Sequence, residues 1–200
     1  YAVGECACVS VHGANRLGTN SLVDLVVFGR RAGRHVAEYV KGADMPAAPK
    51  DAGAHMRERI AKLKEEEGAH PGHVYDTMQD VMMEKIGVYR SDDEMTSAVD
   101  DIQKLRDEFR GVRVQDKSGN FNQEVLSILE LENLLDLSLI TAASALNRTE
   151  SRGAHSRRDY PERDDPNWLK HTMASLDGDS VNISYKKVDT SIWVPKPRKY

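Results

Sequence analysis

The sequence has little of several features that mark large classes of protein. It contains two cysteines, Cys6 and Cys8, which lack the C-x-x-C spacing of redox motifs and have no second pair to complete a zinc site. No uncharged apolar run of about 18 residues is present to cross a bilayer, and nothing resembles a signal peptide. The net charge of −4 argues against general nucleic-acid binding, which usually needs a basic face. We therefore predict no metal site and no nucleic-acid partner.

What is present is typical of a globular protein. Hydrophobic residues make up 40% of the 200 positions and charged residues 30%. A chain of this length can form one large domain or two small ones with a sizeable core. Residues 1–11 resemble a strand, on which we expect Cys6 and Cys8 to be small buried side chains that point to opposite faces.

Hydrophobic periodicity predicts a mostly helical middle. The predicted helices cover residues 20–41, 54–67, 71–86, 91–110 and 124–147. The last is apolar almost all round, which favours a central position in a bundle. Residues 172–176 and 181–188 are predicted strands joined at Asp177-Gly178, a common hairpin turn.

Local signals support these helix limits. Asn20-Ser21 offers an N-cap for the first helix, and Pro71 suits the first turn of the third. Ser91 with Glu94 forms the pattern of a capping box, and Gly111 is suited to end that helix.

The densest chemical pattern surrounds Arg16. Gly13 and Gly18 flank this arginine, so the backbone can take positive φ and approach a ligand closely. The helix predicted to begin at Asn20 adds free N–H groups and a partial positive charge. The guanidinium can bind a carboxylate through two hydrogen bonds, although on the sequence alone a structural salt bridge is an equal alternative.

Two blocks of sequence resemble one known family. Residues 4–33 read GECACVSVHGANRLGTNSLVDLVVFGRRAG, and residues 148–157 read RTESRGAHSR, followed by Asp159-Tyr160-Pro161 and by residues 163–165. Both blocks resemble the flavoprotein subunit of succinate dehydrogenase and fumarate reductase, and they occur in the same order along the chain as in that family. The sequence resembles the C-terminal third of such a subunit. It has no G-x-G-x-x-G, so we expect the dinucleotide fingerprint to lie upstream.

The resemblance implies a fold and a division into segments. We expect a mixed α/β, mostly helical chain. Residues 1–43 would form the end of an FAD-binding domain, 44–52 a linker, 53–147 a helical bundle, and 148–200 a small C-terminal α+β segment.

The resemblance also assigns roles to individual residues. Arg16 matches the arginine that binds a carboxylate of the C4-dicarboxylate substrate, succinate or fumarate. Glu5 matches a carboxylate that contacts FAD, and Ser21 and Leu22 match FAD contacts at the helix start. The arginine that transfers the proton and the histidine that can carry FAD would lie upstream, so the chain alone is not expected to catalyse. The role of His12 stays open: it could orient Arg16, bind substrate or be purely structural.

Partners follow from the same resemblance. Electrons would pass from FAD to an iron–sulfur subunit, with membrane anchor subunits contacted indirectly, on the cytoplasmic face of a bacterial inner membrane or the mitochondrial matrix side. His155 would be part of a polar network that holds the C-terminal segment against the flavin domain, and the arginines around it would also meet the iron–sulfur subunit.

The resemblance implies part of a succinate dehydrogenase, which oxidises succinate to fumarate with hydride transfer to FAD. Three alternatives stay open. Fumarate reduction is the same reaction in reverse. L-aspartate oxidase shares the His-Gly-Ala-Asn-Arg motif. The third is a non-catalytic helical module that binds a partner protein.

Overall fold

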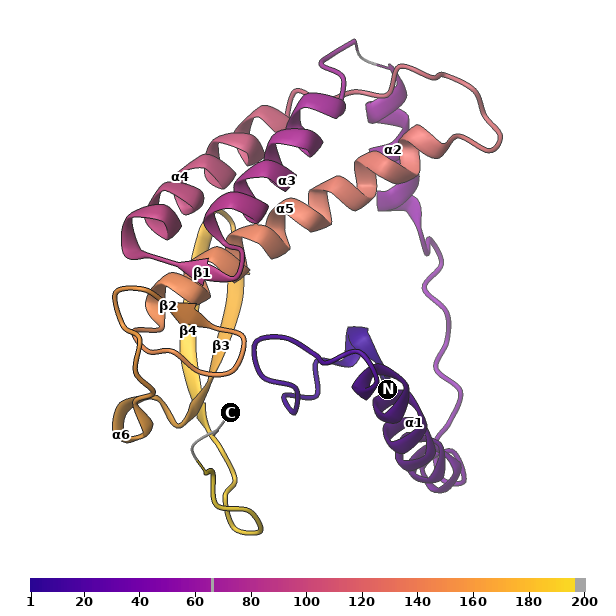
Figure 1. The fold of residues 1–200 in the computed structure, drawn as a ribbon. Helices are drawn as coiled ribbons and strands as arrows, with labels where there is room; N and C mark the ends of the chain where they lie inside the picture. The colour runs from indigo at the N-terminus through magenta and orange to yellow at the C-terminus, as the bar shows by residue number, and fades with distance from the viewer. Residues whose placement is uncertain (66, 197–200) are drawn as a thin grey trace. The chain divides into compact units, whose positions relative to one another are not determined.

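The computed structural model describes residues 1–65 and 67–196. The chain divides into two compact units, Tyr1–Glu58 and Arg59–Tyr200, and each is described separately (Figure 1). The boundary between these units lies inside a helix, whereas the sequence predicted a linker at 44–52. Residues 42–51 form neither helix nor strand, and the predicted domain limits stay predictions.

The first unit has no strand where one was expected at residues 1–11. A short 3₁₀-helix, η1 (Glu5–Ala7), takes its place. Cys8 and Ser10 have φ values of 46° and 61°, a left-handed backbone that cannot continue a strand. Cys6 and Cys8 are both exposed, so their predicted burial was also wrong.

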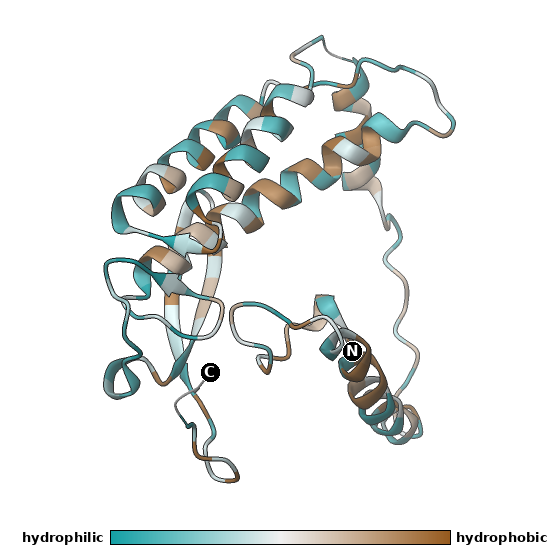
Figure 2. Cartoon of the chain, viewed as in Figure 1, coloured by the Kyte–Doolittle hydropathy of each residue, from teal (hydrophilic) through white to brown (hydrophobic). Residues whose placement is uncertain are grey.

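Helix α1 (Asn20–Tyr39) follows and agrees with the prediction to within two residues at its end. Its N-cap is Thr19 rather than Asn20, and no side chain caps the helix start. The apolar stripe of α1 is exposed, with Leu22 at 69% and Val26 at 70%. Figure 2 shows this apolar surface in brown along the helix.

The second unit is built around helices. Helix α2 (Ala54–Glu65) crosses the boundary between the units, and the second unit also contains α3 (Gly72–Lys85), α4 (Asp92–Phe109), α5 (Gln123–Asn147) and a short α6 (Asp165–Trp168). The order and limits of the longer helices confirm the periodicity analysis. Residue 66, in the predicted 54–67 helix, and residues 197–200, in the C-terminal segment, lie outside the described residues.

Two apolar clusters form the core where α3, α4 and α5 pack together. Met78 and Ile128 lie in one cluster, and Met95, Ile102 and Leu139 lie in the other. Helix α5 buries one face along its length, but Leu126 and Leu137 stay 50% and 59% exposed. The prediction that α5 lies centrally therefore holds for one face only.

The helix ends follow the sequence signals closely. Pro71 is the N-cap of α3, whereas the sequence predicted it inside the first turn of that helix. Ser91 is the N-cap of α4, and its hydroxyl donates to Glu94 Oε2 at 2.7 Å. The Ser-to-Glu pattern thus marks the helix start, but through a side-chain pair rather than the backbone bonds of a capping box.

Strands are few. β1 (Tyr89–Arg90) pairs in parallel with β2 (Ser156–Arg157), and β3 (Lys170–Asp177) pairs antiparallel with β4 (Ser180–Lys187). Gly178, with φ 58°, turns the hairpin. The described chain is mostly helical with a small mixed C-terminal part, as the sequence predicted.

Candidate functional site

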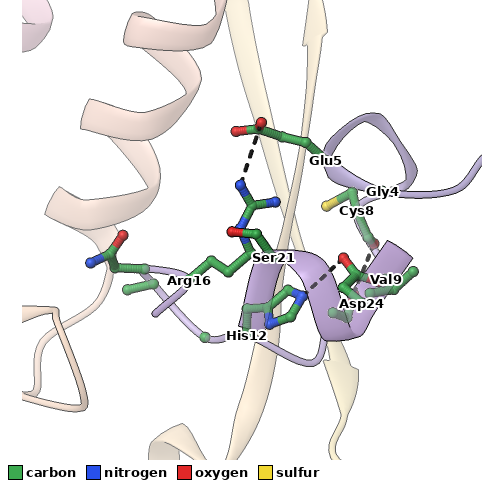
Figure 3. Close-up of a pocket in the computed structure, with 12 residues that line it drawn as sticks. Gly4, Glu5, Cys8, Val9, His12, Arg16, Ser21 and Asp24 are labelled. Carbon is green, nitrogen blue, oxygen red and sulfur yellow. Dashed lines mark hydrogen bonds and ion pairs between the residues drawn. The ribbon is translucent and has the colours of Figure 1, made fainter. Parts of the chain in front are cut away.

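A cavity of about 370 Å³ lies within the first unit, between η1, the loop of residues 8–19 and the start of α1 (Figure 3). Its lining mixes polar side chains, small apolar side chains and loop backbone. The lining residues are Gly4, Glu5, Cys8, Val9, Ser10, His12, Gly13, Ala14, Asn15, Arg16, Ser21 and Asp24.

The loop of residues 12–19 places Arg16 beside this cavity. Gly13 has φ 72°, which a residue with a side chain rarely adopts, and a Cβ at Gly13 or Gly18 would meet nothing within 4 Å. The loop joins the helix through three backbone bonds, from Asn20 N to Leu17 O at 3.0 Å, from Ser21 N to Gly18 O at 3.3 Å and from Val23 N to Thr19 O at 3.5 Å. The sequence pattern of glycines around an arginine therefore forms a real loop at a helix start.

Arg16 and Glu5 lie together, which the sequence did not predict. Arg16 Nη2 is 3.5 Å from Glu5 Oε2, and the two side chains are 27% and 87% exposed. An ion pair to so exposed a carboxylate contributes about 0–1 kcal/mol. Arg16 can therefore exchange this partner for the carboxylate of a ligand at little cost.

The start of α1 supplies the other predicted residues. Ser21 lines the cavity, whereas Leu22 is exposed and is not among the lining residues. With no side-chain cap on α1, its N-terminus keeps the partial positive charge that favours an anion.

Asp24 is a cavity residue that the sequence analysis missed. It is 4% exposed, and its Oδ2 lies 3.1 Å from Nε2 of His12. Its other oxygen, Oδ1, is buried and has no hydrogen-bond partner in the described structure. The available signal was an acid inside the apolar stretch from Leu22 to Val27.

The donors of this site fit a flavin cofactor. They are a guanidinium, a helix N-terminus and a hydroxyl, and the exposed apolar side chain of Leu22 follows Ser21 outside the cavity lining. A flavin has polar N and O atoms along one edge and an apolar ring face, so both kinds of group find a match. Among the described residues, no three His, Cys, Asp or Glu side chains are grouped to hold a metal ion.

The C-terminal arginines belong to a different, structural cluster in the second unit. Glu150 is 1% exposed and accepts from Arg148 and Arg152 at 2.7–2.9 Å, and from the backbone N–H of Asp164. Burial raises the pKa of Glu150, but these hydrogen bonds outweigh burial and hold the pKa below its ordinary value.

Arg157 and His155 complete this cluster. Arg157 is buried, and its guanidinium donates to both carboxylate oxygens of Asp159, which lowers the pKa of Asp159 to about 2. His155 Nδ1 lies 2.8 Å from Arg90 Nη1, and His155 Nε2 lies 3.0 Å from the carbonyl oxygen of Arg148. Burial lowers the pKa of His155. His155 lies in a polar network, as predicted, but this network joins the C-terminal segment to the helices of the second unit and buries Arg157. That the network holds the C-terminal segment against the flavin domain stays a prediction.

None of the described helices is long and apolar enough to span a membrane.

Comparisons with known proteins give a consistent result. The family model described as "Fumarate reductase flavoprotein C-term" matches residues 75–200. The succinate dehydrogenase flavoprotein subunit of Coxiella burnetii is 47% identical in an alignment of 195 positions that covers 94% of this chain and 32% of that protein.

Solved structures give the same result. A mutant of E. coli quinol fumarate reductase has a TM-score of 0.88 and 39% identity, over 98% of this chain and 35% of that one. The Mycobacterium smegmatis Sdh1 complex has a TM-score of 0.77 and 32% identity, over 98% and 33% of the two chains. The chain thus spans about a third of the length of the proteins it matches.

Proposed function

Since the chain belongs to the family of succinate dehydrogenase and fumarate reductase flavoprotein subunits, we propose that it supplies the carboxylate-binding arginine and part of the flavin site of a succinate dehydrogenase. The observation that carries this proposal is Arg16. Its guanidinium lies on a glycine-flanked loop that leads into α1, and among the described residues its one ion pair is to the exposed carboxylate of Glu5.

Arg16 would bind one carboxylate of the C4-dicarboxylate. The planar guanidinium donates two parallel hydrogen bonds, so it fixes the direction of the carboxylate as well as its position. It also stabilises negative charge beside the carbons that react. We assign no described residue of this chain to the uptake of the proton.

FAD would be held by Glu5, Ser21 and Leu22. Glu5 is suited to accept from a ribose hydroxyl, and the N-terminus of α1 would stabilise negative charge on the reduced ring. When bound, FAD accepts the hydride of succinate and releases its electrons one by one. This chain contributes the binding groups and their electrostatic field.

The partners are those of the family. We propose an iron–sulfur subunit as electron acceptor and an indirect link to membrane anchor subunits. The complex would lie on the cytoplasmic face of a bacterial inner membrane or on the matrix side in mitochondria. One of the similar solved structures is described as the Sdh1 complex, which supports assembly with other subunits in general. Fumarate reduction is the second candidate, because the E. coli structure is a fumarate reductase and would use the same arginine.

Replacement of Arg16 in the complete flavoprotein subunit tests this function. Arg16→Ala should retain FAD and lower kcat/KM for succinate by about 10²- to 10³-fold, and Arg16→Lys should fail similarly because an ammonium lacks the fork. Arg57→Ala, at an arginine that pairs with Asp51 at 2.8 Å, is the control with the same charge change. Normal turnover of Arg16→Ala would remove Arg16 from the site.

A further inference from the structure

One buried acid in the first unit has no part in the function proposed above. The side chain of Asp24 is 2% exposed, whereas those of its neighbours Val23 and Leu25 are among the exposed apolar groups of α1. A helix that exposes apolar groups and buries a carboxylate reverses the usual pattern. Because a buried carboxylate is costly unless it is paired, what Asp24 contacts should explain its presence.

Asp24 contacts the loop that carries Arg16. The ring nitrogen Nε2 of His12 is 3.1 Å from Asp24 Oδ2, and Figure 3 shows the His12 ring turned toward Asp24. His12 is the first residue of the loop 12–19, and Asp24 lies in the first turns of α1. The assignment that suits a carboxylate has Nε2–H donating to Asp24.

Other contacts hold this loop weakly. The backbone bonds of Leu17 and Gly18 fix only the end that enters α1. Gly13 adds backbone freedom near the other end, and the exposed carboxylate of Glu5 gives Arg16 little restraint. In the described part of the chain, His12–Asp24 is the one side-chain hydrogen bond that joins the loop to α1.

We propose that His12 and Asp24 are positioning residues, which hold the loop against α1 so that Arg16 meets a dicarboxylate already oriented. This inference rests on the proposed role of Arg16. A fixed arginine loses less conformational freedom when it binds, and a displacement of about 1 Å can cost about 10²-fold in rate. His12 and Asp24 then act through Arg16.

The test is the affinity of the complete flavoprotein subunit for malonate, a dicarboxylate without the CH2–CH2 pair that is oxidised. Binding is followed by the absorbance change of the bound flavin. Asp24→Leu and His12→Met should each weaken malonate binding by about tenfold or more, with flavin content unchanged. Glu38→Gln, at an exposed acid of α1 that pairs with Lys41 at 2.8 Å, is the control and should bind malonate normally.

Conservative and double variants separate positioning from a general structural role. Asp24→Asn can still accept and His12→Gln can still donate, so both should recover most of the affinity. The double variant Asp24→Leu/His12→Met should bind no more weakly than either single variant, because both remove the same bond. The stability order should differ: His12→Met leaves a buried carboxylate unpaired and should lower the Tm more than Asp24→Leu does.

Arg16→Ala, measured alongside, distinguishes the possible failures. If Arg16→Ala keeps its malonate affinity, the proposed function itself fails. If Arg16→Ala loses affinity while Asp24→Leu and His12→Met keep theirs, only the positioning role is overturned. If Asp24→Leu does not retain flavin, His12→Met decides: unchanged malonate affinity there overturns the proposal.

Discussion

Arg157 and Arg158 are adjacent and carry the same charge, yet their replacement should have very different effects on stability. The Arg157 side chain is 0% exposed and donates to Asp159 at 2.7 and 2.5 Å, to Asp92 at 3.2 Å and to the Leu146 carbonyl at 3.0 Å. The Arg158 side chain is 62% exposed. Within the described part of the chain its one ion pair is to Glu94, at 3.5 Å.

These contacts set the expected loss of stability for each replacement. Removing one member of a buried ion pair typically costs about 3–5 kcal/mol, and leaving the Leu146 carbonyl at the end of α5 unpaired accounts for about 1–3 kcal/mol of such a loss. For a chain of this size, each kcal/mol lowers the Tm by about 2–4 °C. Arg157→Leu should therefore lower the Tm by about 6–20 °C. Arg158→Leu should cost less than about 1 kcal/mol, or about 4 °C.

Thermal unfolding followed by far-UV circular dichroism measures both changes. Arg157→Lys is a third variant, which keeps the charge but has one ammonium in place of the five-donor fork, and should recover only part of the loss. Equal Tm losses for Arg157→Leu and Arg158→Leu would refute the assignment of Arg157 as the buried centre of the C-terminal cluster.

Acid should destabilise the fold in two stages. His155 has a lowered pKa in the fold, so the unfolded state binds its proton first and the urea midpoint should fall as the pH drops below about 6.5. Asp159, with a pKa of about 2 against 3.8, should cause a second loss between about pH 4 and 2, and a flat midpoint from pH 7 to 3 would contradict both. Gly87→Ala should lower the Tm, because its Cβ would lie 2.5 Å from the Met83 carbonyl oxygen; an unchanged Tm would disprove that crowding. Ile102→Ala, at 0% exposure, should cost about 2–5 kcal/mol in urea unfolding, whereas a loss below about 1 kcal/mol would place Ile102 outside a packed core.

The helices of the second unit could be predicted from the sequence because their signals are local. Apolar residues recur at the helical period in α3 and α4, and Pro71 and Ser91 mark the helix starts. The β3–β4 hairpin was equally clear, because Gly178 supplies the turn between two alternating strands. These features need no knowledge of distant residues.

The contacts that join distant residues could not be predicted in the same way. Residues 1–11 alternate like a strand, but the left-handed backbone at Cys8 and Ser10 is set by how this segment folds beside α1. The sequence shows arginines at 157 and 158 without showing that only the first lies among Asp92, Asp159 and the end of α5.

The candidate site was half predicted. The glycine-flanked Arg16 and the helix start were visible as a pattern, and the Arg16–Glu5 ion pair adds to that pattern. The His12–Asp24 bond spans 12 positions and pairs residue types that are common in loops and on helix surfaces. Only the folded loop shows that this acid is buried.

The central claim is that Arg16 binds a carboxylate of the substrate. A crystal structure of the complete flavoprotein subunit with bound succinate measures it directly, as the distances from the guanidinium nitrogens of Arg16 to the nearest succinate carboxylate. We predict two parallel hydrogen bonds of about 2.7–2.9 Å, with Glu5 released from its ion pair to Arg16. Succinate bound elsewhere, with Arg16 still paired to Glu5, would contradict the account.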